Sequence, residues 1–233
     1  MRILALDTAT EACSVALLTD TGIIGRFREV GRGHAEQILD MVDATLAEAG
    51  LHVGMLDAIA ASVGPGSFTG VRISVSVAQG LAFGAGLPVI AVTTLEALAL
   101  AAVQSGAARV LACLDARMGE VYWGCYSAHA ELGVMADGGP AVGAAERVTV
   151  PLGGVYHGIG RGFRAYPALA ARHGLLLAAG AAEALPDARY MVELGGARFR
   201  AGQTIDPAGL TPQYLRDKVA LTEAERAAAR GRI

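Results

Sequence analysis

The chain has 233 residues, 53% hydrophobic and 18% charged, so it can bury one large core or two smaller ones. A formal charge of −3 argues against a broadly basic face, so we expect nucleic acid to bind this chain only through a partner. Asp7 and Glu11 interrupt the apolar N-terminus too early for a signal peptide or a membrane span. We therefore expect a cytoplasmic protein that makes no membrane contact.

Strand and helix patterns alternate along the first half of the chain, which indicates an α/β fold. Helix 34–49 has one apolar stripe and one polar face, whereas helix 69–84 is apolar on nearly all sides. We expect another domain, helix or chain to cover the second apolar face of helix 69–84. The predicted strands are 2–6, 13–18, 23–29, 57–63 and 88–92, and the predicted helices are 34–49, 69–84 and 94–104.

An internal echo predicts two related domains. RILALDTATEACSVALL at the N-terminus and VLACLDARMGEVYWGCY at 110–126 both read as strand, aspartate, short turn and strand, with Asp115 in the place of Asp7. The pattern weakens after residue 127, so the second domain is predicted to be abbreviated. We assign the first domain to 1–105, the second to 106–218 and a charged tail to 219–233. Two such hairpin-led domains are the plan of the actin, hexokinase and sugar-kinase superfamily.

Cys13, Cys113 and Cys125 form no CxxC pair and fall inside predicted strands. We interpret them as small core residues of a reducing compartment.

Several stretches together resemble the bacterial TsaB (YeaZ) family over almost the whole chain. They are MRILALDTATEACSVAL, HAEQILDMVDATLAEAG, GPGSFTGVRISVSVAQGLAFGAGLPVIAVTTLEALA, LDARMGEVYWGCY and PQYLRD. The resemblance implies an α/β protein of two actin-like (RNase H-like, ASKHA superfamily) domains. It also implies a non-catalytic subunit that pairs with its catalytic paralogue TsaD, and with the ATPase TsaE, to place threonylcarbamoyl on the adenosine beside the anticodon of certain tRNAs.

Further expectations follow from this resemblance. The chain would form a homodimer when alone and a heterodimer with TsaD, and would contact tRNA only through the complex. It would carry no cofactor of its own, because ATP and metal belong to the partner subunits.

The absence of catalysis rests on one motif. The catalytic paralogue has a run resembling His-His-Met-Glu-Gly-His, in which two histidines on one helical face hold the metal. Here Thr94 and Leu98 stand in those places, and neither side chain is a good metal ligand. The five histidines of this chain are isolated in sequence, so we expect no metal site.

Asp7, Thr8 and Asp115 mark the two hairpin turns that bind phosphate and metal in related kinases. Two interpretations stay open for the aspartates: they bind a magnesium nucleotide, or they cap their turns by accepting backbone N–H bonds. We favour capping, because the only candidate for a glycine-rich adenosine loop, GGVYHGIGRG, is weak. The alternative function is an autonomous actin-like ATPase or kinase, and a metallopeptidase is disfavoured by the missing ligands.

The loop GPGSFTGVR raises the question of a phosphate cradle, but its spacing fits neither a Walker loop nor a dinucleotide loop. We interpret Gly64, Gly66, Ser67 and Thr69 as the tight, capped entry to an interface helix. The resemblance implies that helices 34–49 and 69–84 form a four-helix contact with a partner. The residues predicted at this contact are Met41, Thr45, Val71, Arg72, Val75, Ala78, Gln79, Ala82 and Phe83. Arg72 opposes the helix dipole in the first turn, and two interpretations stay open: a carboxylate or a nucleotide phosphate across the interface compensates it, or it is paired within the chain or exposed to solvent. We favour the first.

Overall fold

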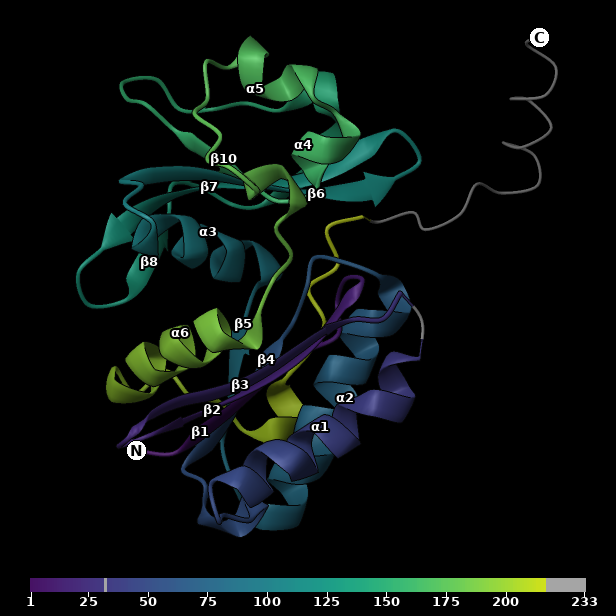
Figure 1. Ribbon diagram of the computed structural model, residues 1–233, viewed down its shortest axis with the longest axis vertical. Coiled ribbons are helices and arrows are strands. Elements are labelled where there is room, and N and C mark those ends of the chain that lie inside the picture. The colour runs from purple at the N-terminus through teal and green to yellow at the C-terminus, as the bar shows by residue number, and fades with distance from the viewer. Residues whose placement is uncertain (32, 217–233) are drawn as a thin grey trace, which may run out of the picture.

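Two β-sheets organise the chain, and the computed structural model shows one above the other (Figure 1). The structure describes residues 1–31 and 33–216. The predicted tail, 219–233, lies outside the described residues.

The first sheet joins an antiparallel meander to two parallel strands in the order β3-β2-β1-β4-β5. These strands confirm the positions predicted from the sequence. Their bounds are β1 (Ile3–Asp7), β2 (Ala12–Thr19), β3 (Gly22–Glu29), β4 (Ala58–Ser62) and β5 (Val89–Val92).

The second sheet is led by a hairpin, as the internal echo predicts, and has the order β10-β6-β7-β8 with β9 paired to β7. Its first strand, β6, lies beside β10 in parallel and beside β7 in antiparallel orientation. The bounds are β6 (Arg109–Arg117), β7 (Glu120–His129), β8 (Gly133–Ala136), β9 (Ala141–Ala144) and β10 (His157–Ile159).

Helices cover both faces of the first sheet and link it to the second. In Figure 1, α1 and α2 lie on one face of the first sheet, α6 lies on the other, and α3 lies between α6 and the second sheet. The short helices α4 and α5 pack on the far face of the second sheet. The bounds are α1 (His34–Glu48), α2 (Phe68–Ala85), α3 (Thr94–Gln104), α4 (Gly162–Ala165), α5 (Ala168–Arg172) and α6 (Ala188–Arg200), with 3-10 turns η1 (Val53–Met55), η2 (Ala145–Arg147), η3 (Ala181–Glu183) and η4 (Pro207–Gly209).

Because helices cover both faces, the strands of the first sheet are apolar throughout rather than alternating. Leu4 and Leu6 of β1 pack in the cluster shared with α1 and α2, whereas Ile3 and Ala5 pack in the cluster shared with α3 and α6. The α6 side is lined by small residues. A Cβ on Gly195 of α6 would lie 3.0 Å from the Cβ of Ala60, so this helix sits close to the sheet.

The C-terminal part of the chain returns to the first sheet. Helix α6 packs on β1 and β2, and Ile205 pairs with Val89 of β5. A boundary at residue 105 separates the two sheets, but it assigns α6 to the domain of the second sheet although α6 packs on the first. The domain division therefore stays a prediction.

Helix α2 is positioned by its entry loop. Ser67 is its N-cap and its Oγ accepts a hydrogen bond from the N–H of Gly70, while Gly86 ends the helix with φ of 65°. Gly70 faces the first hairpin so closely that a Cβ there would lie 2.0 Å from the carbonyl oxygen of Thr8. Gly80, ten residues further along the helix, faces open space.

This contrast gives a matched pair of substitutions. Gly70→Ala should lower the free energy of unfolding by about 3 kcal/mol, because a backbone carbonyl cannot yield to the new methyl group. Gly80→Ala should raise it by about 0.5–1 kcal/mol, because alanine favours the helix and meets nothing. Chemical denaturation of both variants measures the two effects, and a similar loss in both would contradict the close approach at Gly70.

Candidate functional site

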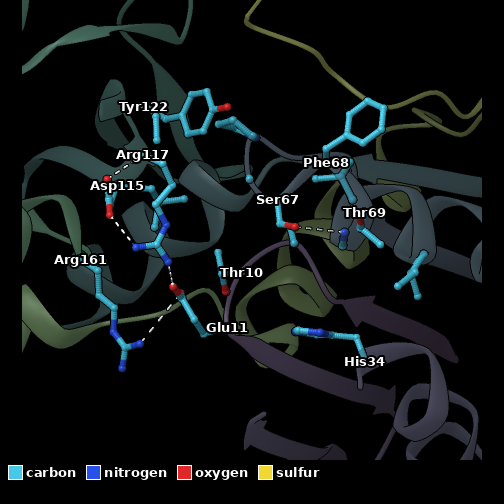
Figure 2. Close-up of a pocket in the computed structure, with 18 of the residues that line it drawn as sticks. Thr10, Glu11, His34, Ser67, Phe68, Thr69, Asp115, Arg117, Tyr122 and Arg161 are labelled. Carbon is cyan, nitrogen blue, oxygen red and sulfur yellow. Dashed lines mark hydrogen bonds and ion pairs between the residues drawn. The ribbon is translucent and has the colours of Figure 1, made fainter. Parts of the chain in front are cut away.

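A cleft of about 740 Å³ opens between the two sheets (Figure 2). Its walls are the turn of the first hairpin, the entry loop and start of α2, the start of α1, the end of β6 and the segment that follows η4. The cleft thus collects the two hairpins and the glycine-rich loop that the sequence singled out.

The charges of the cleft largely neutralise one another. We call the parts built on the first and second sheets the first and second lobes. In Figure 2, Arg117 and Arg161 of the second lobe both point toward Glu11 of the first, at N–O distances of 2.8 and 3.9 Å. Arg161 is only 9% exposed and also donates two hydrogen bonds to Glu29, at 2.6 and 2.8 Å. Asp115 takes a further bond from Arg117 at 3.0 Å. A phosphate entering here would have to displace the chain's own carboxylates.

The two hairpin aspartates cap their turns, which is the interpretation favoured from the sequence. Asp7 Oδ1 accepts the N–H of Ala9 at 2.9 Å, and Asp115 Oδ1 accepts the N–H of Arg117 at 2.8 Å. Asp7 is fully buried and does not line the cleft. Its Oδ2 has no partner among the described residues, and burial raises the pKa of Asp7 to about 6.

The loop Gly64–Thr69 is filled by the first hairpin rather than left open. The N–H of Ser67 donates to the carbonyl of Ala9 at 2.7 Å, and the Oγ1 of Thr8 donates to the carbonyl of Gly70 at 2.6 Å. A Cβ on Gly66 would lie 2.2 Å from the Ala9 oxygen. The glycines therefore serve a close approach between two loops, as the tight-entry interpretation predicts.

Burial corrects the predicted contact residues. Six of them are no more than 4% exposed, because they form the core between α1, α2 and the first sheet, and cannot face a partner: Met41, Thr45, Val71, Val75, Ala78 and Ala82. The amide of Gln79 donates to the carbonyls of Pro207 and Leu210 and holds the C-terminal segment. Only Arg72 and Phe83 are exposed, the latter at 61%.

The exposed face of α2 carries mainly small residues, and Arg72 is its single charged residue within the described helix. Ser76, Gly80 and Gly84 lie on it at helical spacing, with Phe83 near its C-terminal end. Nothing within the described chain comes near a Cβ built on Gly80 or Gly84. The second apolar arc of this helix is half-buried against the same core, so the described chain leaves only this strip of small residues open. The half-buried residues are Ile73, Val77 and Leu81.

Arg72 is held in a fixed orientation at the rim of the cleft. Its guanidinium lies 3.7 Å from the centre of the Phe68 ring, and its Nε donates to the hydroxyl of Tyr214 at 2.8 Å. Sequence reasoning missed this cluster and the Glu11–Arg161 contact, since more than a hundred residues separate their partners in the chain. The run PQYLRD, which carried part of the family resemblance, was the one signal for Tyr214.

Thr94 and Leu98 are both structural. The Oγ1 of Thr94 donates to the carbonyl of Pro65 at 2.5 Å, and Leu98 is buried in the core between α3 and the sheets. Within residues 1–31 and 33–216, no cluster of three His, Cys, Asp or Glu side chains could hold a metal ion. In the same part of the chain, no helix is both long and apolar enough to cross a bilayer.

Comparison with known proteins gives consistent similarities. The family described as "TsaD: tRNA N6-adenosine threonylcarbamoyltransferase" matches residues 22–154. The "tRNA threonylcarbamoyladenosine biosynthesis protein TsaB" of Escherichia coli (strain K12) is 44% identical over 94% of this chain and 96% of that protein. The protein of the same description from Haemophilus influenzae is 40% identical over 94% of this chain and 95% of its own.

The solved structure described as "YeaZ from Pseudomonas aeruginosa" superposes with a TM-score of 0.83 at 40% identity, covering 92% of this chain and 99% of that one. The mixed sheets and these similarities confirm the predicted fold class, an α/β protein of two actin-like units with the second abbreviated.

The raised pKa of Asp7 predicts a pH-dependent effect of Asp7→Asn. A carboxyl whose pKa is raised on folding stabilises the folded state below about pH 4, and this contribution is lost as pH rises through about 6. The asparagine keeps the acceptor for Ala9 and never ionises. It should therefore be more stable than the wild type by about 3 kcal/mol near pH 8, with the gain vanishing near pH 4. Thermal unfolding across this range measures the difference, and a pH-independent offset would contradict it.

The shared role of Glu11 predicts that Glu11→Gln exposes an anion site. Without the carboxylate, Arg117 regains a free N–H donor, whereas Arg161 stays bound to Glu29 and loses only a nearby negative charge. Titration calorimetry should therefore show pyrophosphate binding about tenfold tighter than in the wild type. Glu48→Gln, which loses an ion pair to Arg26 outside the cleft, is the control. Equal binding by the two variants would show that Glu11 does not block the site.

Proposed function

The chain belongs to the TsaB (YeaZ) family of tRNA threonylcarbamoyladenosine biosynthesis proteins, and from this membership we propose that it is a non-catalytic scaffold of that system. It pairs with a TsaD subunit through α1 and α2, joins TsaE in a larger complex, and pairs with itself when alone. It supports transfer of threonylcarbamoyl to the adenosine beside the anticodon without carrying out the transfer.

The observation that carries the proposal is the open face of α2. A helix on one face of a sheet ordinarily turns charged residues to solvent, yet this one exposes small residues and an aromatic ring. Glycine in a helix interior costs stability, and within the described chain nothing at Gly80 or Gly84 requires its small size. A partner helix that packs closely against these positions would explain why they are glycines.

A scaffold role rather than catalysis is supported by two further features. The residues in place of the paralogue's metal ligands, Thr94 and Leu98, are engaged in a backbone hydrogen bond and in the core. The arginines that line the cleft are engaged by carboxylates of the chain itself. ATP and metal would accordingly reside on the partner subunits, and tRNA would be bound by the complex as a whole.

Sedimentation of the chain alone, and then mixed with TsaD from the same source, tests the proposal. We expect a homodimer that gives way to a one-to-one heterodimer. Gly80→Leu should weaken both associations about tenfold or more, because the new side chain fits the free chain but blocks the partner. Gly139→Leu makes the same change at an open position of the second lobe and should leave both associations unchanged.

Two results would count against the scaffold. If the chain stays monomeric and ignores TsaD, the pairing is absent. If it then binds magnesium-ATP at micromolar strength, the alternative of an autonomous actin-like ATPase or kinase takes its place.

A further inference from the structure

The arginine at the start of α2 is held in place but has no carboxylate partner within the described chain. Arg72 is the only charged residue of the helix. It stacks on Phe68 one turn earlier and is tied through Nε to Tyr214, which comes from the far end of the described chain. We call Phe68, Arg72 and Tyr214 the arginine clamp.

The clamp leaves the two Nη groups of the Arg72 guanidinium free to donate hydrogen bonds. The bond to Tyr214 uses Nε, and among the described residues no acceptor lies within hydrogen-bond distance of the two Nη groups. The hydroxyl of Tyr214 accepts this bond and keeps its own proton available to donate. A guanidinium fixed by stacking and one hydrogen bond has lost most of its rotamer freedom, so it can bind a planar acceptor with little further loss of entropy.

Charge complementarity points to a carboxylate on a second copy of this chain. Helices α1 and α2 both start at the cleft and run side by side (Figure 1). Glu36, Asp40 and Asp43 are exposed on α1, and none of them has an ion-pair partner within the described residues. Two such faces brought together would repel through their acids unless Arg72 of each meets them. Within α1 and α2, as the structure describes them, Arg72 is the only arginine or lysine, and its single positive charge matches a singly charged carboxylate.

The relative direction of the two α2 helices decides which acidic residues of α1 can reach Arg72. If two α2 helices packed in parallel about a two-fold axis, Arg72 would face its own copy, which is unfavourable. An antiparallel pair instead places Arg72 beside the C-terminal half of the other α2, where the helix dipole is negative, and beside the later turns of the other α1. Asp40 and Asp43 are the free acids nearest those turns.

We propose that, when the chain pairs with itself, the arginine clamp of each copy binds Asp40 or Asp43 on α1 of the other and sets the antiparallel register of the pair. This contact rests on the proposed self-pairing, and it gives that pairing its charge specificity. Small residues of α2 provide the close approach, while the clamp provides the orientation.

Charge exchange tests the contact by sedimentation equilibrium of the full chain. Arg72→Glu should weaken self-association roughly tenfold or more, and Asp40→Arg or Asp43→Arg should do the same for whichever acid is bound. Combining that acid's reversal with Arg72→Glu should restore association toward the wild-type level. Arg147→Glu, an equal change at an exposed arginine of the second lobe, is the control. Circular dichroism confirms that each variant is folded.

The outcomes separate the contact from the scaffold itself. A wild-type chain that stays monomeric removes the self-pairing and the contact with it. A wild type that pairs, together with an Arg72→Glu variant that pairs equally well, overturns the contact alone. If Arg72→Glu weakens pairing but neither double variant restores it, the proposed acids are wrong. In that case, a wild-type association that changes with added pyrophosphate would identify a phosphate as the ligand instead.

Discussion

The close approach of two loops is the constraint on which the rest of this structure depends. The entry loop of α2 lies against the first hairpin turn so tightly that neither Gly66 nor Gly70 leaves room for a side chain. Hydrogen bonds from Ser67 to Ala9 and from Thr8 to Gly70 fix the two loops together. This contact sets where α2 begins and which of its faces is buried. It therefore sets where Arg72 emerges and how wide the cleft is.

The same contact also affects the hairpin turns that bind phosphate in related kinases. The turns that hold phosphates in related kinases are engaged by the chain: one aspartate is buried, the N–H of Ser67 bonds to the hairpin, and Glu11 lies between two arginines. The loop amide and Glu11 are satisfied within the chain, so the cleft has few free donors for an anion. Oδ2 of Asp7 has no partner among the described residues, but Asp7 does not line the cleft. The ion pairs also join the two lobes, because Arg161 of the second is bound to Glu29 of the first.

The proposed function rests on the outer surface of α2 rather than on the cleft. The face of α2 that points away from the sheet combines small residues, an exposed aromatic ring and one oriented cation, whereas the acids lie on the neighbouring α1. Such a surface exposes apolar groups to water, and its small residues allow a second helix to pack closely in a defined register. The chain belongs to a family named for tRNA threonylcarbamoyladenosine biosynthesis, and this surface is the basis of the proposed subunit role.

The sequence by itself determined the elements of the first half of the chain, the fold class and the family, because strand and helix periods are local and the motifs are contiguous. It placed the first sheet, α1, α2 and α3 correctly, and it identified the helix entry and the two aspartates that cap their hairpin turns. Tertiary structure alone decided which side of α2 is buried, since both sides are apolar and only the sheet selects between them. For that reason Val71 and Val75 proved to be core rather than surface. It also decided the contacts of Arg72 with Tyr214 and of Glu11 with Arg161, because no local spacing encodes partners so far apart in the chain.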